Sequence, residues 1–97
     1  MKTTRVLILI SSDPRNSPRP AEALRVAAGL AAGGRVRVVV FLGAAAAVLS
    51  EPLAFDLPGG EAMTAHLASL RASGGVLEPA PDRLAERVAQ NDTLLRF

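Results

Sequence analysis

Polar side chains that can bind a ligand gather in one segment near the start of the chain. They carry hydroxyl, carboxylate, amide and guanidinium groups, and they are Ser11, Ser12, Asp13, Arg15, Asn16 and Arg19. The segment follows an apolar run and precedes an Ala-rich one, so it lies before a predicted helix N-terminus, where the helix dipole and free N–H groups favour an anion. Arginine pairs well with phosphate or carboxylate. Ser, Asp, Asn and Pro are equally typical of a turn and a helix cap, and no glycine-rich phosphate motif is present. Both interpretations stay open.

Two further candidate ligand-binding residues follow later strands. Gly43 comes directly after the apolar run 38–42, and Glu78 follows the short apolar pair 76–77. A carboxylate at a strand end can act as an acid or base if burial raises its pKa, and it is also typical of a solvated strand end. Parallel sheets bind ligands outside the carboxyl ends of their strands, so we expect these residues and the loop 11–16 to form one site.

Several kinds of chemistry are excluded or disfavoured by composition. The chain has no cysteine, which excludes disulfides, thiolate metal sites and a cysteine nucleophile. His66 is the single histidine, and on the flank of an apolar helix face it is expected to be partly buried or at an interface. Asp13, Asp56 and Glu61 do not form metal-ligand spacing with it. We therefore expect no metal, no cofactor and no assigned catalytic residue.

The overall charge does not favour a nucleic-acid partner. Ten arginines stand against one lysine, but the net charge is only +2, and the arginines are scattered along the chain without interleaved aromatic residues. The longest strictly apolar run is far shorter than the ~20 residues of a membrane-spanning helix. The 97 residues are expected to form a single domain over residues 1–97, and a cytoplasmic location is expected.

Strand and helix patterns alternate along the whole sequence. Apolar, β-branched runs predict strands at 6–10, 36–42, 76–78 and 93–97, and helical patterns cover 21–32, 43–50, 61–73 and 82–91. The two longer runs do not alternate with polar residues, which indicates strands buried on both faces. Residues 52–60 predict a short extended piece or a flap. The expected fold is α/β, with three α/β/α layers around a mostly parallel sheet of four or five strands.

The helix at 21–32 is apolar on most of its sides. Leu24, Ala27, Ala28 and Ala31 follow one stripe, and other apolar residues lie outside that stripe. A helix that is apolar on most sides must be covered on most sides. We expect one side to lie on the sheet and the other to be a candidate subunit interface, which predicts a homo-oligomer.

The order of these patterns resembles the DsrE/DsrF-like family, small α/β proteins linked to sulfur relay. The first strand with its polar loop 11–14, the Ala-rich helix ending in Gly33 and Gly34, and the second strand up to Gly43 carry the likeness. Residues 74–77 resemble the strand that leads to the family's active-site position, and 91–97 are similar to its terminal strand. The resemblance implies a DsrE/DsrF-like fold over nearly the whole chain.

One departure changes what the resemblance implies about function. Catalytic members place a cysteine after the strand that corresponds to 76–77, where this chain has Glu78, Pro79 and Ala80. The resemblance therefore implies a non-catalytic accessory, as a homo-oligomer or a partner of a related sulfur-relay protein. Two other hypotheses remain: a small-ligand or anion-binding protein that uses the loop after the first strand, and a cysteine-independent enzyme that uses Glu78 or His66.

Overall fold

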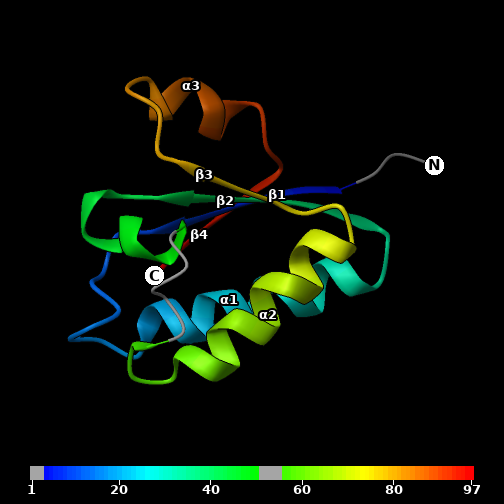
Figure 1. The fold of residues 1–97 in the computed structure, drawn as a ribbon. Coiled ribbons are helices and arrows are strands. Elements are labelled where there is room, and N and C mark those ends of the chain that lie inside the picture. The colour runs from blue at the N-terminus through cyan, green and yellow to red at the C-terminus, as the bar shows by residue number, and fades with distance from the viewer. Residues whose placement is uncertain (1–3, 51–55) are drawn as a thin grey trace.

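The computed structural model of the protein describes residues 4–50 and 56–97. Strands and helices alternate along these residues, as the sequence predicts (Figure 1). The elements are β1 (Thr4–Ile10), α1 (Arg19–Ala32), β2 (Val36–Leu42), the 3₁₀ helix η1 (Ala44–Ser50), α2 (Gly60–Ala72), β3 (Val76–Pro79), α3 (Leu84–Ala89) and β4 (Thr93–Arg96). The expected strands are confirmed, each within two residues at either end.

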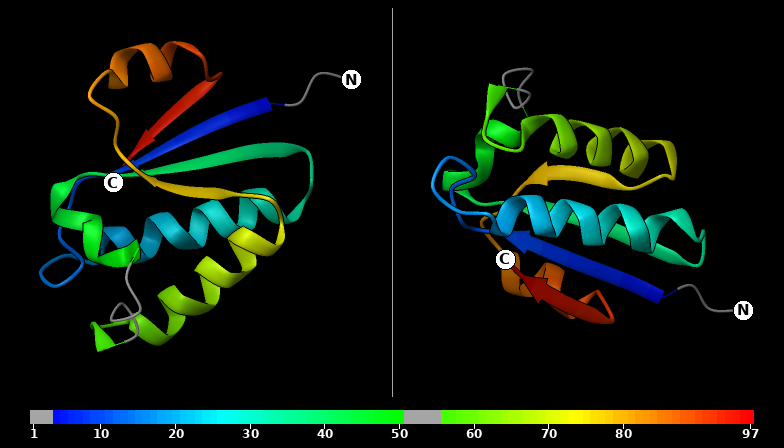
Figure 2. Two further views of the ribbon diagram at one scale, coloured as in Figure 1. Left: turned by 45° about the horizontal axis from the view of Figure 1, so that its top comes forward. Right: turned by 90° about the horizontal axis from the view of Figure 1, so that it is seen from below.

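The strands of the described chain form one four-stranded parallel sheet in the order β3-β2-β1-β4. Helices α1 and α2 lie side by side on one face of the sheet, and α3 lies on the other (Figures 1 and 2). The predicted three-layer α/β/α fold is confirmed. The chain moves from β1 to β2 to β3 in one direction and then returns to place β4 beside β1. Because α3 changes face as the direction reverses, all three crossovers keep the same hand.

Alternate side chains of the central strands enter two separate cores. On the α1/α2 side, Val6, Ile8 and Ile10 of β1 pack with their β2 neighbours and with the two long helices. On the α3 side, Leu7, Leu9 and Phe41 form a smaller cluster, packed against residues such as Leu84. Because successive side chains of a strand point to opposite faces, a strand covered by both layers must be apolar at every position. This explains the uninterrupted apolar runs.

The helix α1 is covered on two sides by its own chain. Its start carries Pro20 in the first turn, and its end is followed by Gly33 and by Gly34 with a φ of 70°. Its apolar residues pack on the sheet and against α2, which lies beside it (Figure 2). The broad cover expected for α1 is therefore confirmed, but much of the side predicted as a subunit interface is occupied by α2. The sequence pattern alone does not distinguish a neighbouring helix from a second subunit.

Three other predictions are corrected in detail. The segment after β2 is a 3₁₀ helix, which suits a short Ala-rich turn. The last helix spans only Leu84–Ala89 rather than residues 82–91, because Asp82 and Arg83 form a turn before it. The predicted extended piece or flap at 52–60 lies partly outside the described residues, and the part that is described enters α2 through a turn. Within the described chain, no helix has the length and hydropathy needed to cross a bilayer.

Candidate functional site

The polar side chains of the loop after β1 bind mainly one another. The Arg15 backbone N–H and Nε donate to Asp13 Oδ1 over 2.9 and 3.0 Å, and a second guanidinium nitrogen donates to Oδ2 over 3.1 Å. The Asn16 amide approaches the same carboxylate at 3.5 Å. The hydrogen bond from Arg15 holds the pKa of Asp13 below its ordinary value. Three of the predicted ligand-binding residues, Asp13, Arg15 and Asn16, are therefore brought together, but in a turn in which they hydrogen-bond to one another.

The carboxyl ends of β1 and β4 meet where the strand order reverses, the place where open α/β sheets bind ligands. The end of β4 already occupies donors at this point. Ser11 N–H donates to the Phe97 carbonyl over 2.9 Å, and the Ser11 hydroxyl lies 3.4 Å from the same oxygen. An Arg19 guanidinium nitrogen donates to the Arg96 carbonyl over 3.1 Å. The Ser11 and Arg19 groups that were expected to bind an anion thus donate hydrogen bonds to the end of β4.

Gly43 and Ser12 complete the predicted loop site. The Gly43 N–H donates to the Ile10 carbonyl over 2.8 Å, and a Cβ at Gly43 would lie 3.5 Å from the Ser11 Cα. The structure thus brings Gly43 beside Ser11, as predicted. The Ser12 hydroxyl oxygen is buried without a hydrogen-bond partner among the described residues. Arg15 and Asn16 line a separate hollow of about 390 Å³ against the start of α2.

Glu78 does not join these loop residues. It lines a different hollow, between the sheet and α3, which we call the α3-side pocket and which measures about 290 Å³. The pocket is lined from β1, β2, β3, α3 and the turn after α3, by Arg5, Arg37, Val39, Phe41, Val76, Glu78, Arg87, Gln90 and Asn91. The single site expected from the sequence is therefore two separate places, and Glu78 belongs to the one that the loop does not reach.

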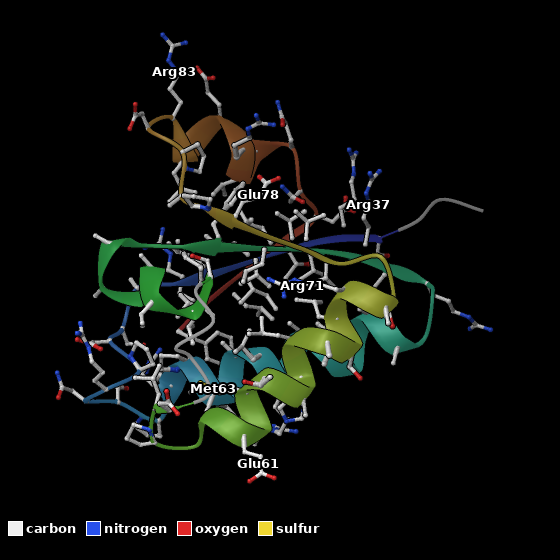
Figure 3. All side chains as sticks on the ribbon, in the orientation of Figure 1. Arg37, Glu61, Met63, Arg71, Glu78 and Arg83 are labelled. Atoms are coloured by element: carbon white, nitrogen blue, oxygen red, sulfur yellow. The ribbon has the colours of Figure 1, made fainter. Side chains whose placement is uncertain are left out.

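Two arginines of the α3-side pocket lie side by side at the amino ends of the central strands. Arg5 and Arg37 are direct register partners on β1 and β2. Both have the strand parity of Leu7 and Val39, so both side chains lie on the α3 face, and Arg37 and Glu78 point to this face in Figure 3. Sequence reasoning missed this pair because it judged the arginines by their spacing along the chain. The sequence does carry one signal for this pair. Each arginine stands two residues before an apolar strand residue of the same face, Arg5 before Leu7 and Arg37 before Val39.

The segment after α3, which lines the pocket, is held to β1 by two hydrogen bonds. The Asp92 carboxylate accepts the Arg5 backbone N–H over 2.7 Å, and the Asp92 N–H donates to the Arg5 carbonyl over 2.9 Å. Gln90 and Asn91 immediately precede this contact and bring two amide side chains to the pocket. Of the described ion pairs, Asp13–Arg15, Glu22–Arg25 and Arg83–Glu86, none includes a pocket arginine. Among the described residues, the Arg5, Arg37 and Arg87 guanidinium groups are thus in none of these ion pairs.

The two residues considered for cysteine-independent catalysis lie on opposite sides of the sheet. Glu78 lines the α3-side pocket, whereas His66 is half-buried on α2. They do not form an acid–base pair. Over residues 4–50 and 56–97, no three acidic or histidine side chains gather as a metal-ligand set.

Comparisons with known proteins do not assign this chain to a family. No family model, no curated protein and no solved structure matches it.

Proposed function

We propose that the chain is a non-catalytic binding protein that holds an anionic group in the α3-side pocket. The observation that carries this proposal is the register pairing of Arg5 with Arg37, with Arg87 lining the same pocket. Two positive charges in neighbouring register positions repel each other, which is an electrostatic cost. An anion bound between them removes that cost, and the planar guanidinium groups suit a carboxylate or phosphate.

The proposal moves the anion site away from the loop that the sequence favours. In that loop Arg15 is paired with Asp13, and Arg19 is bound to the end of β4. An anion must compete with those partners there, whereas Arg37 is in none of the ion pairs between the described residues. Charge that is already compensated by a neighbour contributes less to binding than charge that is not.

The test is a titration of the full chain with inorganic phosphate at low ionic strength, followed by NMR. We expect shifts centred on Arg5, Arg37 and Arg87. Because the pocket arginines are exposed, an Arg37→Ala substitution is expected to weaken binding about three- to fivefold, corresponding to up to ~1 kcal/mol.

Arg71→Ala is the matched control for this titration. Arg71 is exposed on α2, across the sheet from the pocket, so its loss changes the net charge equally without touching the site (Figure 3). Arg15→Ala is the control for the loop. Equal weakening by Arg37→Ala and Arg71→Ala would identify non-specific attraction and overturn the proposal, and so would binding that depends on Arg15.

A second candidate function is the oligomeric, non-catalytic accessory that the DsrE/DsrF-like resemblance implies. The observation that favours it is Val76, a large apolar residue that is 40% exposed on the edge strand β3. A second copy of the chain is the proposed occupant of this edge. Light scattering is expected to show an oligomer that Val76→Asp dissociates. A monomer at working concentration would contradict this candidate and leave the anion-binding proposal intact.

A further inference from the structure

The charges of the α3-side pocket are ordered along the strands. Arg5 and Arg37 share one register row, Val39 and Val76 share the next row on this face, and Phe41 and Glu78 share the third. Arg37 and Phe41 are four residues apart, so the first and third rows are separated by ~13 Å at about 3.3 Å per strand residue. Along the strands, Arg5 and Arg37 therefore lie at one end of the pocket and Glu78 lies at the other.

The floor between the two charged ends is apolar. Phe41 is only 5% exposed and Val39 is half-buried, while Val76 forms the more open side at β3. The helix α3 lies on this side of the sheet (Figure 1), and its Arg87 lines the same pocket. A ligand lying along the strands would place an apolar body on Val39 and Phe41, with a polar group at each end.

The anionic end restricts which anions fit. Glu78 lines the same pocket as the three arginines, yet the described ion pairs do not include it. A carboxylate at this position repels a second negative group on the ligand, which disfavours polyanions such as a nucleic-acid backbone. The volume of about 290 Å³ also lies at the lower end of ligand pockets, which span roughly 300–1,000 Å³. Both facts favour a small ligand.

We propose that the α3-side pocket takes a small bipolar organic ligand, with a carboxylate or phosphate at Arg5 and Arg37, an apolar body over Val39 and Phe41, and an ammonium group at Glu78. The inference rests on the proposed anion-binding function and adds the polarity and length of the ligand. An ω-amino carboxylate has this chemistry, and so does a short peptide with free termini.

The experiment measures the affinity of the full chain for a graded set of probes by NMR titration. The bipolar probes are aminobutyrate, aminohexanoate and aminooctanoate, each with its amino group on the terminal carbon, and octanoate and octylamine are the singly charged controls. We expect aminooctanoate to bind about fivefold more tightly than octanoate, as an exposed ion pair with Glu78 allows. Aminobutyrate is too short to reach both ends, so it should show no gain over butyrate, which is its own singly charged control.

Variants assign the two ends of the ligand. Glu78→Gln should remove the preference for aminooctanoate over octanoate and leave octanoate binding intact, and Glu78→Asp, which keeps the charge, should retain part of the preference. Arg37→Ala should weaken aminooctanoate and octanoate alike, whereas Arg71→Ala should weaken neither. Thermal melts of all variants establish that they are folded, which is expected because the substituted residues are exposed.

The outcomes separate this inference from the proposed function. Octanoate binding as tightly as aminooctanoate, or a preference that survives Glu78→Gln, would overturn the bipolar ligand. If phosphate still binds in an Arg37-dependent manner in that case, the anion site stands. If neither phosphate nor any carboxylate probe perturbs the pocket, both proposals fail. If the bipolar ligand stands, the free peptide tetraalanine is compared with its amidated and acetylated forms. This comparison distinguishes a peptide ligand from a simple amino carboxylate.

Discussion

The two faces of the sheet differ in how completely the chain covers them. On the α1/α2 side, two helices of 14 and 13 residues cover the larger of the two apolar cores. On the α3 side, one described helix of six residues covers a smaller cluster, and no residue of that helix is fully buried. Arg37 and Glu78 lie on this second face (Figure 3), and Arg5 lines the same pocket. The larger apolar core and the proposed binding site thus lie on opposite faces of the same strands.

The difference explains why the charged residues are tolerated where they are. A guanidinium group on the α1/α2 face would be desolvated between the sheet and two helices, at a cost of several kcal/mol. On the α3 face the strand ends extend beyond the short helix, so Arg5 and Arg37 stay exposed. An incompletely covered face is therefore the place where polar side chains can be both ordered by the sheet and reachable by a ligand.

The largest expected effect on the free energy of unfolding comes from truncating one leucine on each face of the sheet, in two separate variants. Leu70 of α2 is fully buried, whereas Leu84 of α3 is half-buried. Leu70→Ala is expected to lower the free energy of unfolding by about 2–5 kcal/mol, and Leu84→Ala by about 1 kcal/mol, because less apolar area and a smaller cavity are involved. Urea unfolding measures both. Equal losses would show that the α3 cluster stabilises the fold as much as the main core does.

The next largest effect on stability is expected from substituting two separate glycines. A Cβ at Gly75, where the chain leaves α2 for β3, would collide with the Leu70 side chain, while a Cβ at Gly29 on the outer side of α1 meets nothing within 4 Å. Gly75→Ala is expected to destabilise the fold by about 1–3 kcal/mol through overpacking. Gly29→Ala should stabilise it by about 0.5–1 kcal/mol through helix propensity. If both substitutions shifted the melting temperature in the same direction, that result would contradict the close approach of Gly75 to α2.

The smallest expected effect contrasts the Asp13–Arg15 pair of the loop with the pocket arginines, which are in none of the described ion pairs. Arg15 lowers the pKa of Asp13 from its ordinary value of 3.8. Because the folded pKa is below the unfolded one, the contribution of Asp13 to stability is present above the unfolded pKa and is lost as the pH falls through the folded pKa. NMR titration should show the Asp13 pKa rising toward its ordinary value in Arg15→Ala and unchanged in Arg37→Ala. A response to Arg37→Ala would mean that the loop and the pocket are electrostatically coupled.

The sequence predicts the fold well because the strongest signals are local. The unbroken apolar runs of β1 and β2, the helical pattern of α1, and the glycines at its end each depend on a few neighbouring residues. The bounds of the last helix were predicted less accurately. The last helix was expected over ten residues and spans six, since a short helix has few apolar positions to mark its ends.

The candidate site was predicted only in part. The loop 11–16 lies at the end of β1 as expected, and Gly43 lies beside it, but the sequence does not reveal that Arg15 pairs with Asp13 or that Phe97 occupies the Ser11 donors. These are competitions among polar groups, and which partner wins depends on distances that only the folded chain defines. Glu78 lines a hollow on the α3 side of the sheet, not the loop site for which the sequence suggests it.

By itself, the sequence determined the order and type of the elements and the absence of cysteine chemistry, because local propensity, periodicity and composition require no partner from elsewhere in the chain. The tertiary structure decided which arginines meet. Arg5 and Arg37 are 32 positions apart, and parallel pairing of β1 with β2 makes them neighbours on one face. Register and face are collective properties of the sheet, so a pocket composed of residues from several elements appears only when those strands and helices are assembled.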